Sequence, residues 1–292
     1  MNLRVGFVGG SLGNVARFGV AGIAIGDYLA TIGRRPAKRD GLRQPRCILP
    51  VRVNIPVMHG VIDRRILVNY RIDPEVLSGV LPDPFRPKTV GGYGIGGVCL
   101  IRLKGLRPRR TPAAFGISSE NAAHRFAVEW DEDGSLKEGV YIPRRDTSSR
   151  LNVLLGGRLF PGYHHLAKFD VQEGGGRYRV EMTSDDGGAK LMVDGKIADD
   201  LPQSSIFPSL EEASSFFEAG SLGYSDSRRA GTYDGLELMS VNWRVEPLDV
   251  DSIESSLFDD ETKFPPGSAV FDCALLMRDI DHEWHERRPL RR

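Results

Sequence analysis

Gly-Val-Tyr-Ile-Pro-Arg-Arg-Asp-Thr-Ser-Ser-Arg occupies residues 139–150, and Gly-Gly-Arg-Leu-Phe-Pro-Gly-Tyr-His-His follows at residues 156–165. Gly139–Ile142 has the apolar and β-branched content of a strand. Asp146 or Thr147 can cap a helix in which leucines recur at steps of three and four residues, at positions 151, 154, 155 and 159. The Phe-Pro-Gly sequence at 160–162 predicts a turn. The stretch therefore predicts a strand, a capped helix and a second strand.

Strand patterns dominate on both sides of this stretch. The candidates combine β-branched or aromatic residues with alternation, and they are Arg65–Arg71, Tyr93–Leu103, His124–Trp130, Leu166–Gln172, Arg177–Thr183, Ala189–Val193, Tyr233–Val245 and Ser268–Met277. In one of them the alternation places Arg125 and Phe126 on opposite faces. The glycines at 94, 96 and 97 predict a bend, or a close approach of a ligand or backbone.

Two further helices are predicted from capping signals. Pro74–Leu81 follows Asp73, a good N-cap, and Leu210–Ala219 follows Ser209, which forms a capping box with Glu212. Strands outnumber helices, and the hairpin signals favour antiparallel pairing. We therefore expect a mainly β (α+β) fold: a closed or nearly closed antiparallel β-barrel with two or three short peripheral helices.

Charged segments are interpreted as solvated surface. The tail Asp281–Arg292 is predicted to be exposed, and its His282 and His285 lack the His-Glu-x-x-His spacing of zinc peptidases. The same interpretation is given to the arginine pairs, including Arg144 and Arg145, because acidic residues lie close to most of them in the sequence.

The composition excludes several classes of protein. The chain has 292 residues, 40% hydrophobic and 27% charged, with a formal net charge of zero, which argues against a nucleic-acid partner. No apolar run is long enough to span a membrane. Cys47, Cys99 and Cys273 are far apart, which argues against a zinc site or disulfides, and Cys99 lies in an apolar run that predicts burial. We expect a cytoplasmic protein without a metal or cofactor.

Residues 1–46 are interpreted as a separate extension that is disordered or not native. They are rich in Gly, Ala and Arg and end in a basic, linker-like stretch. Glycines at 6, 9, 10 and 13 follow a strand-like run, but not with the Gly-x-Gly-x-x-Gly spacing of a dinucleotide site. A nicotinamide-dependent oxidoreductase and a signal peptide are weaker alternatives. Residues 47–292 are predicted to form the barrel domain.

Particular segments resemble a known superfamily. Residues 70–82, Tyr-Arg-Ile-Asp-Pro-Glu-Val-Leu-Ser-Gly-Val-Leu-Pro, resemble the opening strand and helix of acetoacetate decarboxylase-like proteins. Gly139–Ser149 and Arg158–Lys168 are more similar to an uncharacterised bacterial branch of that superfamily, a domain of unknown function. The resemblance covers about residues 55–280. It implies a cone-shaped antiparallel β-barrel whose interior holds a small organic ligand.

The resemblance fails at the residue that carries the decarboxylase chemistry. The decarboxylases have a Tyr-Pro-Lys-Lys turn with a Schiff-base lysine, whose pKa is lowered by its lysine neighbour and an apolar pocket. The two lysine positions align with Gly162 and Tyr163, and the nearest lysines are Lys104 and Lys168. An imine mechanism is therefore not expected.

Three residues at the turn are candidates for the site. Strand alternation points Tyr163 and His165 to one face and His164 to the other. Histidine titrates near neutral pH and can act as an acid or base, so we assign Tyr163 and His165 to proton transfer and His164 to ligand contact. The alternative is one surface histidine and one hydrogen-bonded core histidine. Adjacent histidines on a strand cannot easily reach one metal ion, so no metal site is expected.

Arginines are the candidates for binding an anion. Arg125 or Arg64 would hold a carboxylate through a bidentate contact. Arg150 is a further candidate, although its place in the Ser-Arg-Leu motif favours a structural role that ties the helix to the barrel.

Together these residues predict an enzyme that acts on a keto acid or related organic acid by enol or hydration–dehydration chemistry. The alternative is a non-catalytic carrier or sensor of a small apolar ligand. Convergence of Tyr163, His165 and Arg125 in a closed pocket would favour the enzyme, and an all-apolar lining would favour the carrier. A homo-oligomer is left open.

Overall fold

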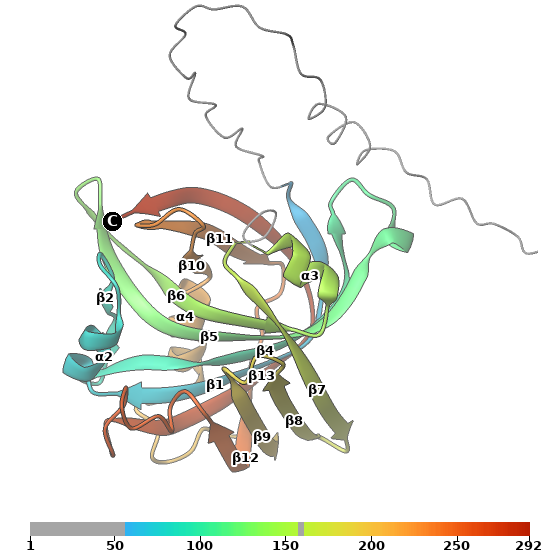
Figure 1. Ribbon diagram of the computed structural model, residues 1–292. Coiled ribbons are helices and arrows are strands. Elements are labelled where there is room, and N and C mark those ends of the chain that lie inside the picture. Colours follow the sequence, from blue (N-terminus) through green and yellow to red (C-terminus); the bar gives the residue numbers. More distant parts are fainter. Residues whose placement is uncertain (1–55, 157–160) are drawn as a thin grey trace, which may run out of the picture. The chain divides into compact units, whose positions relative to one another are not determined.

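The computed structural model describes residues 56–156 and 161–292 (Figure 1). The strands form one 13-stranded sheet: β1 (Met58–Ile72), β2 (Arg86–Pro87), β3 (Thr89–Val90), β4 (Tyr93–Pro108), β5 (Ile117–Glu132), β6 (Ser135–Thr147), β7 (His164–Gly174), β8 (Arg177–Ser184), β9 (Lys190–Ile197), β10 (Leu222–Asp226), β11 (Thr232–Ser240), β12 (Glu246–Ser255) and β13 (Ala269–Arg291). The described helices are α2 (Pro74–Val80), α3 (Arg150–Leu155) and α4 (Leu210–Ala219), with a 3-10 turn at Ala113–Phe115. The mainly β fold with short helices is confirmed. The extension 1–46 and residues 159 and 160 of the predicted helix and turn lie outside the described residues.

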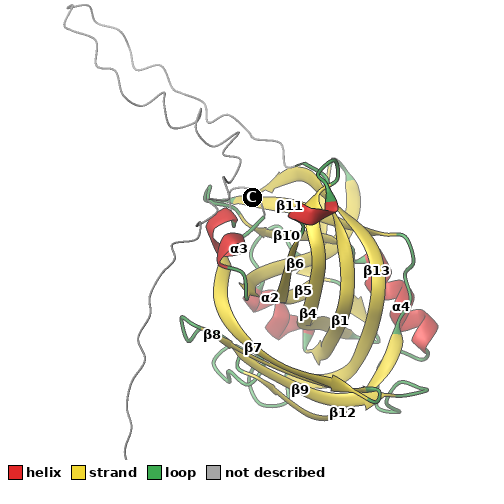
Figure 2. Cartoon of the chain, turned by 90° about the vertical axis from the view of Figure 1, so that its right-hand side faces the viewer, coloured by secondary structure: helices red, strands yellow, loops and turns green. Residues whose placement is uncertain are grey.

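The strands close into two connected rings. One ring runs β6-β7-β8-β9-β12-β13-β1-β4-β5 and returns to β6 (Figure 2). A second connection leads from β6 through β10 and β11 to β13. Strands β13, β1, β4, β5 and β6 therefore belong to both rings, and we call them the shared wall.

Most neighbouring strands are antiparallel, as predicted, but β6 is an exception on two sides. It pairs in parallel with β7 over 145–147 and with β10 over 140–141. The connection from β6 to β7 contains α3, which turns the chain back to the same end of the sheet and so gives a parallel pair.

The shared wall separates two apolar clusters. Phe126, Val128 and Trp130 of β5 point into the larger cluster, together with residues of β8, β9 and β12 across the nine-strand ring. Ala127 points to the other face, where it packs with Phe217 of α4 and residues of β11 and β13. The predicted alternation along His124–Trp130 is thus confirmed, and it places Arg125 on the α4 side.

The helix caps follow the sequence with one exception. Asp73 accepts hydrogen bonds from the first turn of α2, and Ser209 accepts one from the backbone N–H of Glu212 in α4. The cap of α3 is Ser149, because Asp146 and Thr147 still belong to β6. The predicted apolar face of α3 is also wrong in part, since the side chains at 151 and 154 are exposed.

The close approach predicted at the glycines of β4 is confirmed for the backbone. A Cβ atom on Gly97 would lie 2.0 Å from the carbonyl oxygen of Val68 on β1. Any larger side chain at this position would therefore push β1 and β4 apart.

The charged C-terminal tail is a strand, not a solvated segment. β13 continues to Arg291 and pairs with β1 on one edge and β11 on the other. His282 is fully buried, which overturns its assignment to the surface. Strands β10 and β12 were also missed. Among the described residues, no helix is long and apolar enough to cross a membrane.

Candidate functional site

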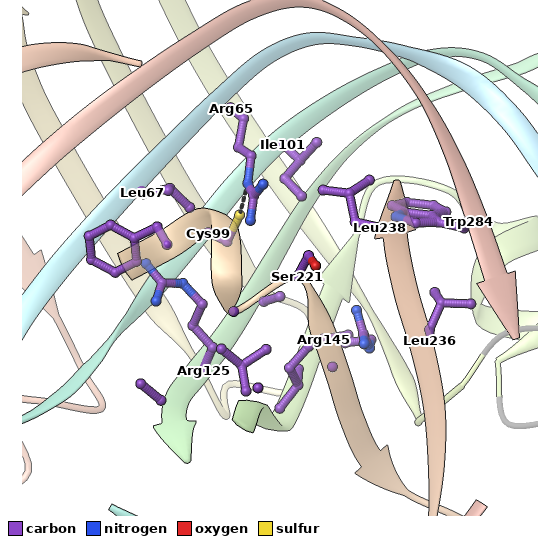
Figure 3. Close-up of a pocket in the computed structure, with 18 of the residues that line it drawn as sticks. Arg65, Leu67, Cys99, Ile101, Arg125, Arg145, Ser221, Leu236, Leu238 and Trp284 are labelled. Carbon is purple, nitrogen blue, oxygen red and sulfur yellow. Dashed lines mark hydrogen bonds between the residues drawn. The ribbon is translucent and has the colours of Figure 1, made fainter. Parts of the chain in front are cut away.

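A cavity lies on the α4 side of the shared wall, where α4, β10 and β11 face it. It contains about 830 Å³ of atom-free space, a figure that includes the part open to solvent. Its walls are largely apolar, with Leu67, Ile101, Phe217, Leu238 and Trp284 among the lining residues. Three arginines interrupt this apolar surface (Figure 3).

The strand register places the three arginines on one face of the wall. Arg145 on β6 lies opposite Ala123 on β5, in the same row as Cys99 on β4. Arg125 is two residues after Ala123 on β5. Arg65 on β1 pairs with Ile101 on β4, which is two residues from Cys99 in the opposite direction. Side chains two residues apart on a strand share a face. Figure 3 shows Arg65 reaching toward Cys99 from one side of the cavity, with Arg125 and Arg145 entering from the other side.

Arg125 is almost fully buried, at 3% exposure, and only partly hydrogen-bonded. One terminal nitrogen donates to Oδ1 of Asn69, while Nε and the other terminal nitrogen have no hydrogen-bond partner. The guanidinium lies over the ring of Phe217, 5.0 Å from its centroid. Burial, together with a smaller effect of the nearby charge of Arg65, lowers the pKa of Arg125 to about 10. The group is still a cation at neutral pH.

Arg145 and Arg65 likewise contact only neutral groups. Nε of Arg145 donates to the hydroxyl of Ser225 at 3.3 Å, and burial lowers the pKa of this guanidinium to about 10. Nε of Arg65 donates to Sγ of Cys99 at 3.0 Å, and its guanidinium carbon lies 5.6 Å from the ring centroid of Trp243. None of the described residues supplies these three arginines with an ion-pairing carboxylate.

A second space continues from the first and shares Cys99, Arg145 and Trp284 with it. His164 and Asn152 line its far side. Burial and the charge of Arg145 lower the pKa of His164 to about 3, so the imidazole is neutral at physiological pH. A neutral imidazole at this place can donate or accept a hydrogen bond.

The residues predicted from the turn do not meet in the cavity. Arg125 lines the main space and His164 the second space. Tyr163 is 49% exposed and lies beside Arg228, and Nδ1 of His165 contacts Asp186 at 2.8 Å. Neither lines the two spaces, so the predicted convergence with Arg125 does not occur.

The other two predicted arginines also lie elsewhere. Arg64 is buried on the opposite face of β1, where it pairs with Glu120 at 2.5 Å and Glu173 at 2.7 Å. Arg150 is exposed at the start of α3. The sequence analysis missed Arg65, because Arg64 was chosen beside it. It also missed Arg145, which belongs to an arginine pair interpreted as solvated surface. Strand alternation could have indicated Arg65, which shares a face with Leu67, but an irregularity in β6 between residues 141 and 144 breaks the alternation before Arg145.

A lysine is present at the cavity, but not at the turn. Nζ of Lys88 contacts a carboxylate oxygen of Glu138 at 2.8 Å and lies over the ring of Phe216. At the turn, Gly162 has a positive φ of 76°, and a Cβ atom there would lie 2.8 Å from Cβ of Ser225. A lysine at this position would be both strained and crowded.

The model of a family of uncharacterised conserved proteins, DUF2071, matches residues 62–273. The chain belongs to this family. The expected acetoacetate decarboxylase-like fold is confirmed by the solved structures that the chain matches. A search of curated proteins finds no significant match.

The structural matches establish the fold of this DUF2071 member, at low sequence identity. The acetoacetate decarboxylase of Legionella pneumophila matches with a TM-score of 0.56 at 10% identity, covering 87% of this chain and 98% of the other. An acetoacetate decarboxylase-like enzyme from Sphingomonas wittichii has a TM-score of 0.53 at 11% identity, covering 82% and 94%. The enduracididine biosynthesis enzyme MppR, complexed with pyruvate, also has a TM-score of 0.53, at 10% identity, covering 81% and 91%.

Proposed function

We propose that this protein binds a small organic acid, of the keto-acid class, in the arginine-lined cavity. The observation that carries the proposal is Arg125: a cation, buried among apolar residues, with two nitrogens unpartnered and no carboxylate beside it. A buried charge is costly unless it is paired. A ligand carboxylate would supply that pair through a charge-assisted contact.

The keto-acid class is supported by the fold. The matched structures include decarboxylases of a keto acid and an enzyme complexed with pyruvate. The apolar remainder of the lining suits the carbon chain of such an acid.

We further propose that the acid is held without an imine. Lys88 is engaged by Glu138, Lys104 pairs with Asp63, and Lys168 is exposed. An imine requires a free amine aimed at the carbonyl carbon, whereas Lys88 is held by Glu138, and Lys104 and Lys168 do not line the cavity. This reasoning supports acid–base chemistry such as enolisation or dehydration on a non-covalently bound acid.

The proton carriers of such chemistry differ from those that the sequence suggested. Tyr163 and His165 do not line the cavity, so we transfer their role to cavity-lining groups. His164 and Cys99 are the candidates, since both border the space beside Arg145. The alternative function, a carrier of an apolar ligand, has less support, because a neutral ligand would leave the three cations in the pocket uncompensated.

The proposal predicts a thermal shift that depends on Arg125. At a ligand concentration ten times Kd, the full-length protein should gain about 1.4 kcal/mol, or about 3–6 °C in Tm. 2-Oxobutyrate should produce the shift, and its neutral analogue 2-butanone should not. Arg125→Met should abolish the shift, whereas Arg150→Met, at an exposed position, should retain it.

Two outcomes would contradict the proposal. Equal shifts in wild type and Arg125→Met would remove this residue from the site. A mass increase after borohydride treatment in the presence of 2-oxobutyrate would reveal an imine on a lysine, and would overturn the non-covalent mechanism.

A further inference from the structure

The positive charge of the cavity exceeds what a simple keto acid can balance. Arg65, Arg125 and Arg145 line it, and none of the described residues that line the main space is acidic. Lys88 is already paired with Glu138. Three guanidinium charges therefore remain for a ligand to compensate.

Two buried or partly buried arginines elsewhere in the fold have carboxylate partners. Arg64 contacts two carboxylates, and Arg144 holds both carboxylate oxygens of the buried Asp146, at 3.0 and 2.9 Å. At these two positions the fold itself provides the acidic partners. Among the described residues no carboxylate lines the main space, and Asp146, which lines the second space, is already held by Arg144, so we look for the partners of the cavity arginines in the ligand.

One carboxylate cannot serve all three cations. A carboxylate can contact two guanidinium groups, as Glu120 contacts Arg64 and Arg102, but its single negative charge does not compensate three cations. With a monocarboxylate bound, the other arginines would stay uncompensated in a poorly solvated space, which disfavours binding. A ligand with two anionic groups balances the cavity better.

The register separates the arginines enough for two anionic groups. Arg125 and the position opposite Arg145 are two residues apart on β5, which corresponds to about 7 Å along the strand. Cys99 pairs with the same β5 position as Arg145, namely Ala123, and Arg65 reaches this cysteine from the opposite side to Arg125. Arg65 and Arg125 are close enough for each charge to affect the other, whereas Arg145 stands toward the second space with His164.

We propose, building on the organic-acid function above, that the ligand is a dicarboxylic acid. One carboxylate is held by Arg125 with Arg65, and the other by Arg145. The carbon chain between them lies against the apolar wall around Cys99.

The test compares two acids that differ at one end. 2-Oxoglutarate and 2-oxopentanoate share a five-carbon 2-oxo acid frame, and a methyl group in the second replaces the terminal carboxylate of the first. Isothermal titration calorimetry on the full-length protein should give at least tenfold tighter binding of 2-oxoglutarate. Arg145→Met should remove this preference and change the affinity for 2-oxopentanoate less than about threefold, while Arg145→Lys should retain part of it.

Each outcome separates this inference from the broader function. Equal affinities for the two acids in wild type would overturn the dicarboxylate proposal and leave organic-acid binding intact. A preference that survives in Arg145→Met would overturn the role of Arg145. Binding of neither acid, nor of 2-oxobutyrate, would overturn the proposed function and this inference with it. The comparison of the two acids on the wild-type protein tests the dicarboxylate proposal even if Arg145→Met does not fold.

Discussion

The free energy of unfolding is expected to fall by about 6 kcal/mol between pH 7 and pH 5, because three buried histidines resist protonation. His124 is 2% exposed and His282 is fully buried, and burial lowers the pKa of each from 6.5 to about 4. His164 has a pKa of about 3 for the same reason, reinforced by Arg145. Typical domains have only about 5–15 kcal/mol to lose.

The direction follows from which state binds the proton. In the unfolded chain these histidines protonate as the pH falls through 6.5, while in the folded protein they stay neutral until about pH 4. The unfolded state therefore gains protons first, and stability declines from pH 6.5 downward. Each histidine contributes about 2 kcal/mol over the 1.5 pH units between 6.5 and 5. Above pH 7 their contribution is constant.

The groups around His124 do not reverse this direction. Asp146 favours the imidazolium, but its carboxylate is already held by Arg144. Arg144 and Lys263 both oppose a second positive charge. Desolvation remains the largest effect.

Urea unfolding from pH 8 to pH 5 tests this prediction. His124→Gln should flatten the dependence by about 2 kcal/mol between pH 6.5 and 5. A wild-type stability that does not vary with pH over this range would show that the buried histidines protonate freely.

Local patterns predicted most of the fold, and the exceptions share a cause. The alternation in β5 and the caps of α2 and α4 depend on neighbouring residues, so the sequence shows them directly. β13 does not look like a strand at its end, because its charged side chains find cross-strand partners such as Glu237 for Arg287. The charged side chains at the end of β13 are explained by their partners on the neighbouring strand, and a single sequence does not show which residues become neighbours.

The site was predicted in part for a similar reason. Arg125 could be found because its strand alternates cleanly with apolar neighbours. Tyr163 and His165 were assigned by alternation from a turn, yet the direction of that turn depends on packing against Ser225 and on the parallel pairing of β7 with β6. Arg145 was missed because its environment is made by β10, which the sequence did not predict.

Replacing two buried arginines by methionine should distinguish a structural cation from a ligand-binding one. Arg64→Met is expected to destabilise the protein by about 3 kcal/mol, since it removes one partner from a buried ion cluster. Glu120 and Glu173 would then share Arg102 alone. Methionine fills much of the vacated volume, so lost packing contributes little.

Arg125→Met is expected to change the stability by less than about 1 kcal/mol, or to raise it. No described carboxylate is left unpaired by this change, and the cost of burying the charge disappears. The loss of the contacts with Asn69 and Phe217 offsets part of that gain. Arg177→Met, at an exposed position with surface ion pairs, is the control and should cost less than about 1 kcal/mol.

Chemical denaturation of the ligand-free variants at pH 7.5 measures all three differences under one condition. The contrast between Arg64 and Arg125 follows from their partners, since both side chains are buried on strands of the shared wall and only Arg64 has carboxylates beside it. If Arg125→Met costs as much as Arg64→Met, then Arg125 stabilises the fold by itself. A ligand carboxylate would then no longer be needed to explain why this cation lies in an apolar cavity.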